Sequence, residues 1–249
     1  MKISVIVPVY ESWELVPGLV GALKCQTFDS QEYEVILVDN GSSFVNKASL
    51  PPNWIISLCD KPGSYAARNK GVDLAKGEIV AFTDSDCLPQ PDWLANLVEG
   101  IGDSELRAGT VAIWTRRKPN WVERFDSLKG IPQERYVSRG YAVTANLAVP
   151  ARLLRSLGGF DESRFSGGDA EFCRRAVARG ATLEYVRNAV VNHPARSSWS
   201  QLVRKARRVK GGQVKSGSLP RRVLWILRTL LPPVLEWKYI LSAKNCSFA

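Results

Sequence analysis

The alternation of apolar and polar segments along the chain predicts an α/β fold. Three short runs of mostly apolar residues, many of them β-branched, occupy residues 3–9, 34–38 and 78–82, and polar residues or glycine follow each one. Strands that are buried on both faces of a parallel sheet have this pattern. The intervening segments 15–23 and 65–75 have helical length. This order predicts a doubly wound sheet that binds its ligand at the carboxyl ends of the strands.

The same patterns predict the remaining elements of the first two thirds of the chain. Residues 119–139 are polar, contain aromatic residues and lack a clean period. They are interpreted either as a mobile loop over a site or as an irregular surface connection. Elsewhere we expect strands at 55–58, 109–115, 141–149 and 182–191, and helices at 92–100, 151–157 and 169–179.

Charge divides the chain after His193. The formal net charge of the 249 residues is +10. Residues 1–193 contain 22 Lys and Arg against 23 Asp and Glu, whereas residues 194–249 contain 12 against 1. The basic excess therefore belongs to the last segment, and we expect a catalytic or binding domain over 1–193 and a basic tail over 194–249.

The tail has the composition of a segment that lies on a membrane. A helix is expected at 198–210, then a Gly/Ser linker at 211–218 and two short apolar runs containing Trp225 and Trp237. Neither run approaches the ~20 apolar residues that span a bilayer. Basic residues beside short Trp- and Leu-rich helices suit an anionic membrane interface. The cations could instead neutralise nucleic-acid phosphates, but the Trp and Leu residues favour lipid.

Cysteine usage and the first residues favour the cytoplasm. The five cysteines are scattered and contain no C-x-x-C pair, as expected of reduced thiols. The apolar run at 3–9 is too short for a signal peptide. We therefore expect a cytoplasmic protein that lies peripherally on the inner membrane face.

The most specific local feature is the sequence Asp84-Ser85-Asp86 at the end of a predicted strand. Side chains two residues apart in an extended chain point the same way, so two carboxylates are expected to converge. Such a pair binds a hard divalent cation and leaves positions for water and phosphate. Taken alone, the tripeptide is more typical of a turn or a helix N-cap.

Two further segments are expected at the same edge of the sheet. Asp39 follows the second strand, where an acid can accept hydrogen bonds from a ribose or a base, although Asn40-Gly41-Ser42 is also an ordinary turn. Gly63 and Ser64 begin a helix of small residues that contains Arg68. A helix start with a cation favours a diphosphate, while the alternative is a capped surface helix.

Taken together, the motifs resemble those of family 2 glycosyltransferases. The resemblance covers about residues 1–193, and the motifs occur in the family's order and approximate spacing: Val5–Tyr10, Val38–Ser42, Ala67–Gly71, Asp84–Asp86 and Gly158–Glu162. It implies the GT-A fold, a nucleotide-diphosphate sugar as donor with UDP favoured, a divalent cation (Mn²⁺ or Mg²⁺), and inversion at the anomeric carbon.

The resemblance also implies roles for individual residues. It assigns Gly159 and Phe160 to a segment that lines the sugar pocket on the acceptor side. It assigns metal ligation to Asp84, Asp86 and His193, the single histidine, which ends the last predicted strand. Donor binding is implied for Pro8, Tyr10, Asp39, Ala67, Arg68, Asn69, Asp84 and Ser85.

The segment from Gly167 to Arg175 is similar to the family's acidic motif at a helix start. Gly168 stands where the first acid is expected, and Asp169 retains the second acid, which is the family's general base. Glu171 is the nearest alternative and is assigned to the acceptor side. One positioned carboxylate is chemically sufficient to take the proton of an acceptor hydroxyl. Without the resemblance, Asp169 is an ordinary N-cap.

These observations predict an inverting, metal-dependent glycosyltransferase. The basic tail suggests an acceptor at the membrane, such as a lipid-linked or cell-envelope glycan. The alternative is a module that binds a nucleotide sugar at the membrane but has lost transfer, and Gly168 is the argument for it. Retention of Asp84, Asp86, Asp169 and His193 argues against that alternative.

Overall fold

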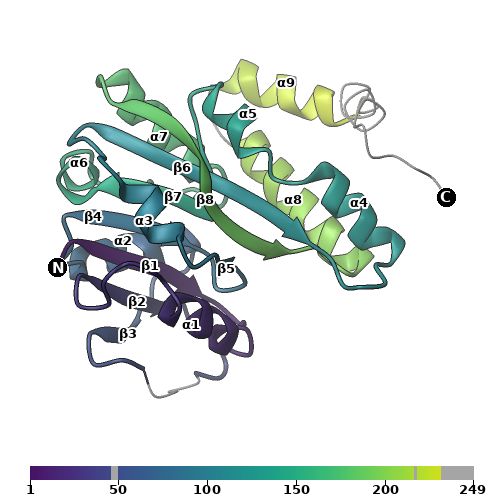
Figure 1. Cartoon of the computed structure of the whole chain (residues 1–249). Coiled ribbons are helices and arrows are strands. Elements are labelled where there is room, and N and C mark those ends of the chain that lie inside the picture. The colour runs from purple at the N-terminus through teal and green to yellow at the C-terminus, as the bar shows by residue number, and fades with distance from the viewer. Residues whose placement is uncertain (46–49, 216–217, 231–249) are drawn as a thin grey trace. The chain divides into compact units, whose positions relative to one another are not determined.

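The computed structural model describes residues 1–45, 50–215 and 218–230, which form two compact units (Figure 1). One division between the units falls after His193. The tail unit also takes up two segments that the charge pattern assigned to the first domain. The core unit comprises residues 1–112, 132–163 and 168–193, and the tail unit comprises 113–131, 164–167 and the residues after 193.

A mixed eight-stranded sheet in the order β3-β2-β1-β4-β7-β6-β8-β5 organises the described residues. Strands β3, β2, β1 and β4 are parallel to one another, and β7 pairs antiparallel with β4. This arrangement confirms the predicted doubly wound α/β sheet. The strands are β1 (Ile3–Val9), β2 (Tyr33–Asp39), β3 (Trp54–Leu58), β4 (Ile79–Thr83), β5 (Leu88–Pro89), β6 (Glu105–Trp114), β7 (Asn146–Pro150) and β8 (Thr182–Pro194).

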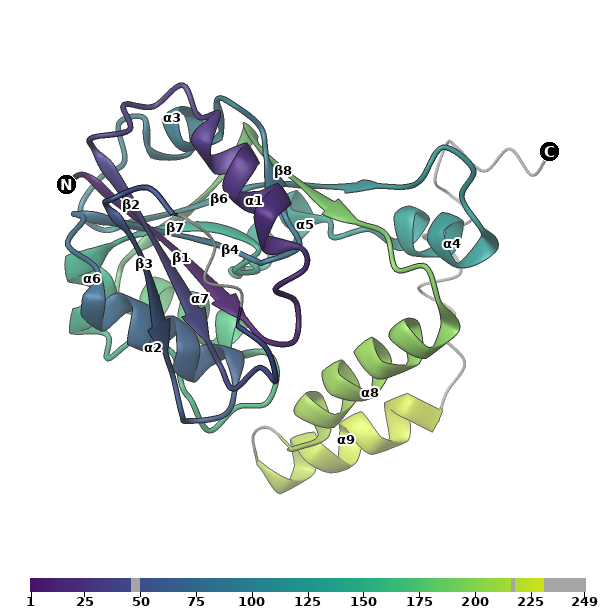
Figure 2. The same ribbon diagram turned by 90° about the horizontal axis from the view of Figure 1, so that it is seen from below.

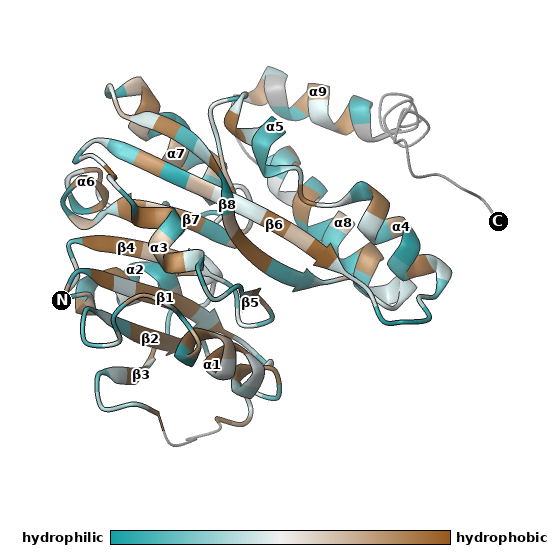
Figure 3. Ribbon diagram, in the orientation of Figure 1, coloured by the Kyte–Doolittle hydropathy of each residue, from teal (hydrophilic) through white to brown (hydrophobic). Residues whose placement is uncertain are grey.

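Helices cover both faces of the sheet in the core unit (Figure 2). Helices α1 (Val16–Lys24) and α3 (Trp93–Val98) lie on one face. Helices α2 (Ser64–Leu74), α6 (Ala151–Ser156) and α7 (Gly168–Ala178) lie on the other. The two covered faces explain why the central strands are almost wholly apolar, as their hydropathy colours show (Figure 3).

Close packing of α2 on the sheet depends on Gly71. A Cβ at this position would lie 2.5 Å from a side-chain carbon of Ile6 on β1. The absence of a side chain lets the helix approach the strand, and real Cβ contacts are not that short. The small residues Ala66 and Ala67 are buried at the same interface. This contact fixes the start of α2 relative to the ends of β1 and β2.

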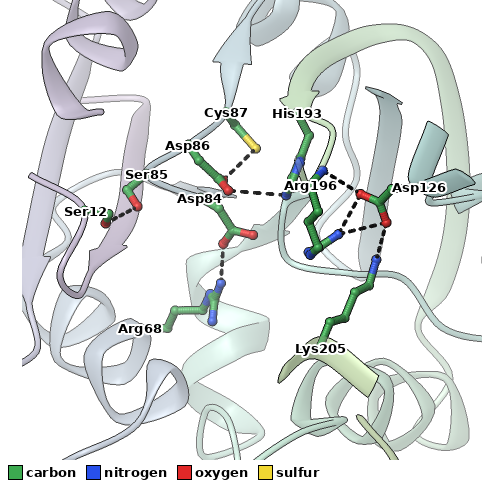
Figure 4. A network of polar contacts seen from close by, with 10 residues as sticks. All are labelled: Ser12, Arg68, Asp84, Ser85, Asp86, Cys87, Asp126, His193, Arg196 and Lys205. Carbon is green, nitrogen blue, oxygen red and sulfur yellow. Dashed lines mark hydrogen bonds and ion pairs between the residues drawn. The ribbon is translucent and has the colours of Figure 1, made fainter. Parts of the chain in front are cut away.

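The tail unit is built on a buried ion pair. The carboxylate of Asp126, on α4 (Trp121–Lys129), is 2% exposed and accepts hydrogen bonds from the backbone and guanidinium of Arg196 at 3.0–3.3 Å (Figure 4). Lys205 Nζ lies 3.7 Å from the same carboxylate. Helix α8 (Trp199–Lys215) provides Lys205 and packs beside α9 (Leu219–Leu230).

Several expected elements differ from the structure. Residues 119–139 do not form a loop, because they contain α4 and the short helix α5 (Gln133–Val137). A capping box between Asn120 and Glu123 begins α4, and this local signal is independent of apolar periodicity. The strand predicted at 141–149 begins only at Asn146, and the one predicted at 109–115 begins earlier, at Glu105.

The predicted linker after residue 210 is wrong where the structure describes it, because α8 continues to Lys215. Gly212 is buried, and a Cβ there would lie 2.7 Å from the side chain of Ser166. This glycine therefore permits close packing within the tail unit and does not end the helix. Among the described residues, no helix is long and apolar enough to cross a bilayer. The second apolar run with Trp237 lies outside the described residues.

Candidate active site

The candidate site lies where the parallel strands of the core unit end. The register pairs Val9 at the end of β1 with Asp39 at the end of β2, and Phe82 near the end of β4 lies opposite Ile6. The parallel strands therefore present the residues that follow them at one edge of the sheet. The start of α2 lies at the same edge, because Asn40 accepts a hydrogen bond from the Gly63 N–H at 2.7 Å.

The carboxylates of Asp84 and Asp86 each contact a partner of their own (Figure 4). Asp84 Oδ1 accepts a hydrogen bond from Arg68 at 2.6 Å. Asp86 Oδ2 lies 3.5 Å from Nε2 of His193. The antiparallel pairing of β5 and β8 places Leu88 opposite Asn192, which brings His193 beside Asp86. The structure thus brings two of the three expected metal ligands, Asp86 and His193, close together. The third, Asp84, pairs with Arg68.

Arg68 is a buried cation, with its side chain 5% exposed. Its guanidinium also contacts the carbonyl of Ser64 at 3.3 Å, and its Nε has no hydrogen-bond partner among the described residues. A buried charge requires a partner, and Asp84 supplies the opposite charge. Arg68 therefore orients Asp84, and its direct role on a diphosphate stays a prediction.

Asp39 holds the turn after β2. Its side chain accepts hydrogen bonds from Trp13 Nε1 at 2.7 Å and from the backbone N–H groups of Gly41 and Ser42 at 3.1 Å. Burial alone would raise the pKa of Asp39, but these hydrogen bonds outweigh it and hold that pKa below its usual value. Asp39 is 2% exposed. Its ionised carboxylate therefore stabilises the turn and offers very little surface to a base or ribose.

The loops after β1 and β2 are tied together at this edge. The Glu11 N–H donates to the Ser42 hydroxyl, and the Glu11 carboxylate accepts from the backbone and hydroxyl of Ser43. Glu11 has a φ of 48°, a left-handed conformation that is strained for this residue type. Tyr10 precedes it and is 65% exposed, so its ring is accessible to a ligand.

Four other residues that were predicted to contact a ligand make contacts within the protein. Phe160 is 2% exposed and packs against Tyr65, Phe82 and Phe172, so its ring belongs to the core. Ala67 is fully buried, and Ser85 hydrogen-bonds Ser12 at 2.8 Å. Glu171 pairs with Arg175 at 2.8 Å, which in turn binds the carbonyl of Gly159.

Asn69 serves the loop that contains Gly159 and Phe160. Its Oδ1 accepts from the Phe160 N–H at 2.9 Å, and its Nδ2 donates to the Phe160 carbonyl and to Glu162. Gly159 has a φ of 67°, and a Cβ there would lie 2.5 Å from Asn69 Oδ1. Both ends of the Asn69 amide are therefore occupied by this loop, and its contact with the donor stays a prediction.

Asp169 begins α7 at the same edge of the core unit. Its Oδ1 accepts from the Ala170 N–H at 2.9 Å and lies 3.3 Å from the Tyr65 hydroxyl. Burial raises the pKa of Asp169, and the nearby carboxylate of Asp84 adds to that effect, while Arg68 opposes it. A carboxylate with a raised pKa is suited to accept a proton.

Sequence reasoning missed residues that organise the site without touching a ligand. Asn40 donates to the carbonyls of Cys59 and Lys61 and thereby shapes the loop before α2. Trp13 fixes Asp39, and Tyr65 contacts Asp169. The turn sequence after Asp39 signalled a structured loop, but nothing in the sequence identified the partners, because they are distant along the chain.

The hollow lined by Lys2, Glu78, Gly100 and Asp103, with a volume of about 740 Å³, is separate from this site. It lies beside the amino-terminal ends of β1 and β4, which is the opposite edge of the sheet. The carboxylates and cations described above are absent from its lining.

The fold of the chain is of the GT-A type. The fold resembles a crystal structure of S. aureus TarS in complex with UDP-GlcNAc, with a TM-score of 0.62 and 20% identity over 96% of this chain and 70% of that one. It also resembles GalNAc-T7 with UDP, GalNAc and Mn²⁺, with a TM-score of 0.61 and 18% identity over 91% of this chain and about half (48%) of that one.

The family model described as "Glycosyl transferase family 2" matches residues 4–155, and the chain belongs to this family. It is therefore a glycosyltransferase. The chain is 35% identical to "Glycosyltransferase AglE" of Haloferax volcanii, over 92% of this chain and 81% of that protein. It is also 28% identical to "Glucosyl-dolichyl phosphate glucuronosyltransferase" of the same organism, over 78% of this chain and 69% of that protein.

Replacing Asn69 by alanine should destabilise the core unit. The substitution leaves the N–H and carbonyl of Phe160 without their partner, and each unsatisfied buried group costs about 1–3 kcal/mol. We expect the free energy of unfolding to fall by about 2–4 kcal/mol in urea denaturation. Lys70→Ala, at an exposed position of the same helix, is the control and should change it by less than about 0.5 kcal/mol. Equal stability of the two variants would contradict this role of Asn69.

Proposed function

We propose that the enzyme transfers a sugar from a nucleotide-diphosphate donor to an acceptor hydroxyl with inversion, and that Asp169 is the general base. The observation that carries the proposal is the position of the Asp169 carboxylate, held by Tyr65 and the Ala170 N–H at the edge of the sheet where the strands end. Burial raises the pKa of this carboxylate. Its pKa responds to Arg68 and Asp84, which places it within electrostatic range of the other charged groups there. A base in this place takes the acceptor proton as the donor bond breaks.

The donor assignment is supported by the fold and by the edge of the sheet. Parallel α/β sheets bind nucleotides outside the carboxyl ends of their strands, and the start of α2 offers backbone N–H groups to a diphosphate. The exposed ring of Tyr10 is available to stack on a base. The TarS structure with UDP-GlcNAc makes a uridine nucleotide our preferred donor for this chain.

A divalent cation suits the donor atoms that the site offers. Carboxylate oxygens and an imidazole nitrogen are ligands for Mn²⁺, and Asp86 and His193 already lie together at 3.5 Å. Within the residues that the structure describes, no group of three such side chains is gathered around one point, and Asp84 pairs with Arg68. Asp86 and His193 would hold the cation, with Asp84 beside them. When bound, it would supply positive charge to the departing diphosphate.

The acceptor is proposed to be a lipid-linked or cell-envelope glycan reached at the inner membrane face. Helix α9 supports this proposal because several large apolar side chains on it are 46–71% exposed. Its cations Arg222 and Arg228 accompany them, and Lys210 lies 5.8 Å from the Trp225 ring. Such helices bind anionic interfaces through apolar burial and charge. The exposed apolar residues are Leu219, Val223, Leu224, Ile226 and Leu227.

Replacing Asp169 by asparagine should abolish most of the transfer. Asparagine keeps the shape of the side chain but does not accept the acceptor proton, so kcat should fall about 10²–10⁴-fold with little change in donor KM. Because the pKa of Asp169 is raised, activity of the unmodified enzyme should fall with decreasing pH at a higher pH than an ordinary aspartate would give. Release of nucleoside diphosphate from a panel of nucleotide sugars, with Mn²⁺ and membrane extract, measures both effects.

Asp73→Asn, at an exposed position of α2, is the matched control and should retain full turnover. Unchanged turnover in Asp169→Asn together with loss in Glu171→Gln would assign the base to Glu171. Nucleotide binding without release from any donor would favour the module that has lost transfer.

The membrane proposal predicts a specific effect of charge on α9. The double variant Leu224→Glu, Leu227→Glu places two acids on the exposed apolar face, so it should bind vesicles containing phosphatidylglycerol at least about 10-fold more weakly. Val177→Glu, at an exposed apolar position of α7, is the control and should bind as the unmodified chain does. Cosedimentation with vesicles measures the difference. Equal binding of all three, or retention on duplex DNA in preference to vesicles, would contradict the proposal.

A further inference from the structure

The space in which a side chain of residue 168 would stand is filled by Tyr65. A Cβ built on Gly168 would lie 2.7 Å from Cε2 and 2.8 Å from Cζ of the Tyr65 ring. The ring is 6% exposed and stacks on Phe160 with a centroid separation of 5.8 Å, so it has little room to move away. The fold therefore accommodates either this tyrosine or a side chain at 168. This explains why glycine stands where the resemblance predicts an acid.

The hydrogen bonds of the Tyr65 hydroxyl have a defined direction. The Gly168 N–H, which can only donate, lies 2.8 Å from this oxygen. The hydroxyl has one proton, and the Asp169 carboxylate, which accepts when ionised, lies 3.3 Å away at Oδ1. The tyrosine proton is therefore directed to Asp169. Burial raises the pKa of Tyr65 to about 12, so the hydroxyl keeps that proton at any working pH.

We propose that Tyr65 is a positioning residue for Asp169. It holds the Asp169 carboxylate in place in a chain that has glycine, and not a second acid, at position 168. The proposal rests on Asp169 being the general base. Tyr65 donates a hydrogen bond to Oδ1 of Asp169, and the Ala170 N–H donates a second one to the same oxygen. Both hydrogen bonds described for this carboxylate reach Oδ1, so Oδ2 is the oxygen that takes the acceptor proton. No proton leaves Tyr65 during transfer.

The groups that act on the ionisation of Asp169 come from three elements. Tyr65 and Arg68 on α2 favour the carboxylate, and Asp84 after β4 disfavours it. On α7 itself, the Ala170 N–H favours it, and the Cys173 thiol is close enough to feel its charge. Burial opposes all of the favourable contacts. Removal of the tyrosine hydroxyl should therefore raise the pKa of Asp169 further.

The first experiment is a carboxyl-carbon NMR titration of Asp169 in the protein without substrate, with the resonance assigned by Asp169→Asn. Tyr65→Phe keeps the ring but removes the hydroxyl, and we expect the midpoint to rise by about one unit. Tyr33→Phe is the matched control, because it removes another buried hydroxyl, which donates to the Leu23 carbonyl. Its midpoint should equal that of the unmodified chain. An unchanged midpoint in Tyr65→Phe would overturn the proposal.

Turnover supplies a second readout that a purely structural role would not move. In Tyr65→Phe the acidic limb of the pH–rate profile should shift upward with the NMR midpoint. On that limb, where Asp169 titrates, kcat at a given pH should fall up to about 10-fold with donor KM unchanged, because the loss falls on the base and not on donor binding. A fall in kcat that is equal at every pH would contradict the proposal. Full activity in Asp169→Asn would instead refute the base assignment itself, which separates the two failures.

A double-mutant cycle tests the steric part of the proposal. Gly168→Ala should destabilise the unmodified chain, because its Cβ overlaps the Tyr65 ring, and should cost far less in a Tyr65→Ala background. Urea denaturation of the four proteins gives the coupling. Additive effects of the two substitutions would show that Tyr65 and Gly168 do not depend on each other. This measurement needs no substrate.

Discussion

The parallel register of β1, β2 and β4 is the constraint on which the candidate site depends. Ile3 of β1 lies opposite both Tyr33 of β2 and Ile79 of β4, so the strands run in step toward one edge of the sheet. Side chains that follow the strands meet there although they are distant in sequence. The packing of α2 on β1 through Gly71 brings a helix start to the same edge. The order and direction of the strands alone therefore bring the polar side chains to this edge of the sheet.

The charged groups at this edge of the sheet interact with one another. Arg68 is buried and needs an anion, and Asp84 provides one at 2.6 Å. Asp86, two residues on, lies 3.5 Å from His193. Arg68 and Asp84 also act in opposite directions on the ionisation of Asp169. One buried cation therefore contacts an acid of the Asp84-Ser85-Asp86 motif and also influences the proposed base.

The fold could be predicted from the sequence because the periodicity and length of the apolar runs indicate its strands and helices. The strands at 3–9, 34–38 and 78–82, and the helices that follow the first two, are present with small shifts at their ends. The helices within 119–139 were missed because α4 is short and begins at a cap, whose signal is a pair of polar residues. Gly212 was misinterpreted as a linker residue because its packing partner, Ser166, is 46 residues away.

The positions of the site residues could be predicted more successfully than their contacts. Asp84, Asp86, His193 and Asp169 all lie in the core unit, at the ends of the expected elements. Motif spacing does not show that Phe160 is buried or that Asn69 serves a neighbouring loop, because burial and hydrogen bonding depend on tertiary packing. The same limit applies to Tyr65, whose partner at 168 is a glycine and so leaves no side chain to suggest a contact.

The central claim is that a single carboxylate base drives direct displacement at the anomeric carbon. The configuration of the transferred sugar tests it most directly. With a nucleotide sugar that the enzyme uses, NMR of the product gives the anomeric configuration before it can equilibrate. The account predicts inversion relative to the donor. Retention of configuration would contradict it, because a single displacement from the face opposite the leaving group always inverts the anomeric carbon.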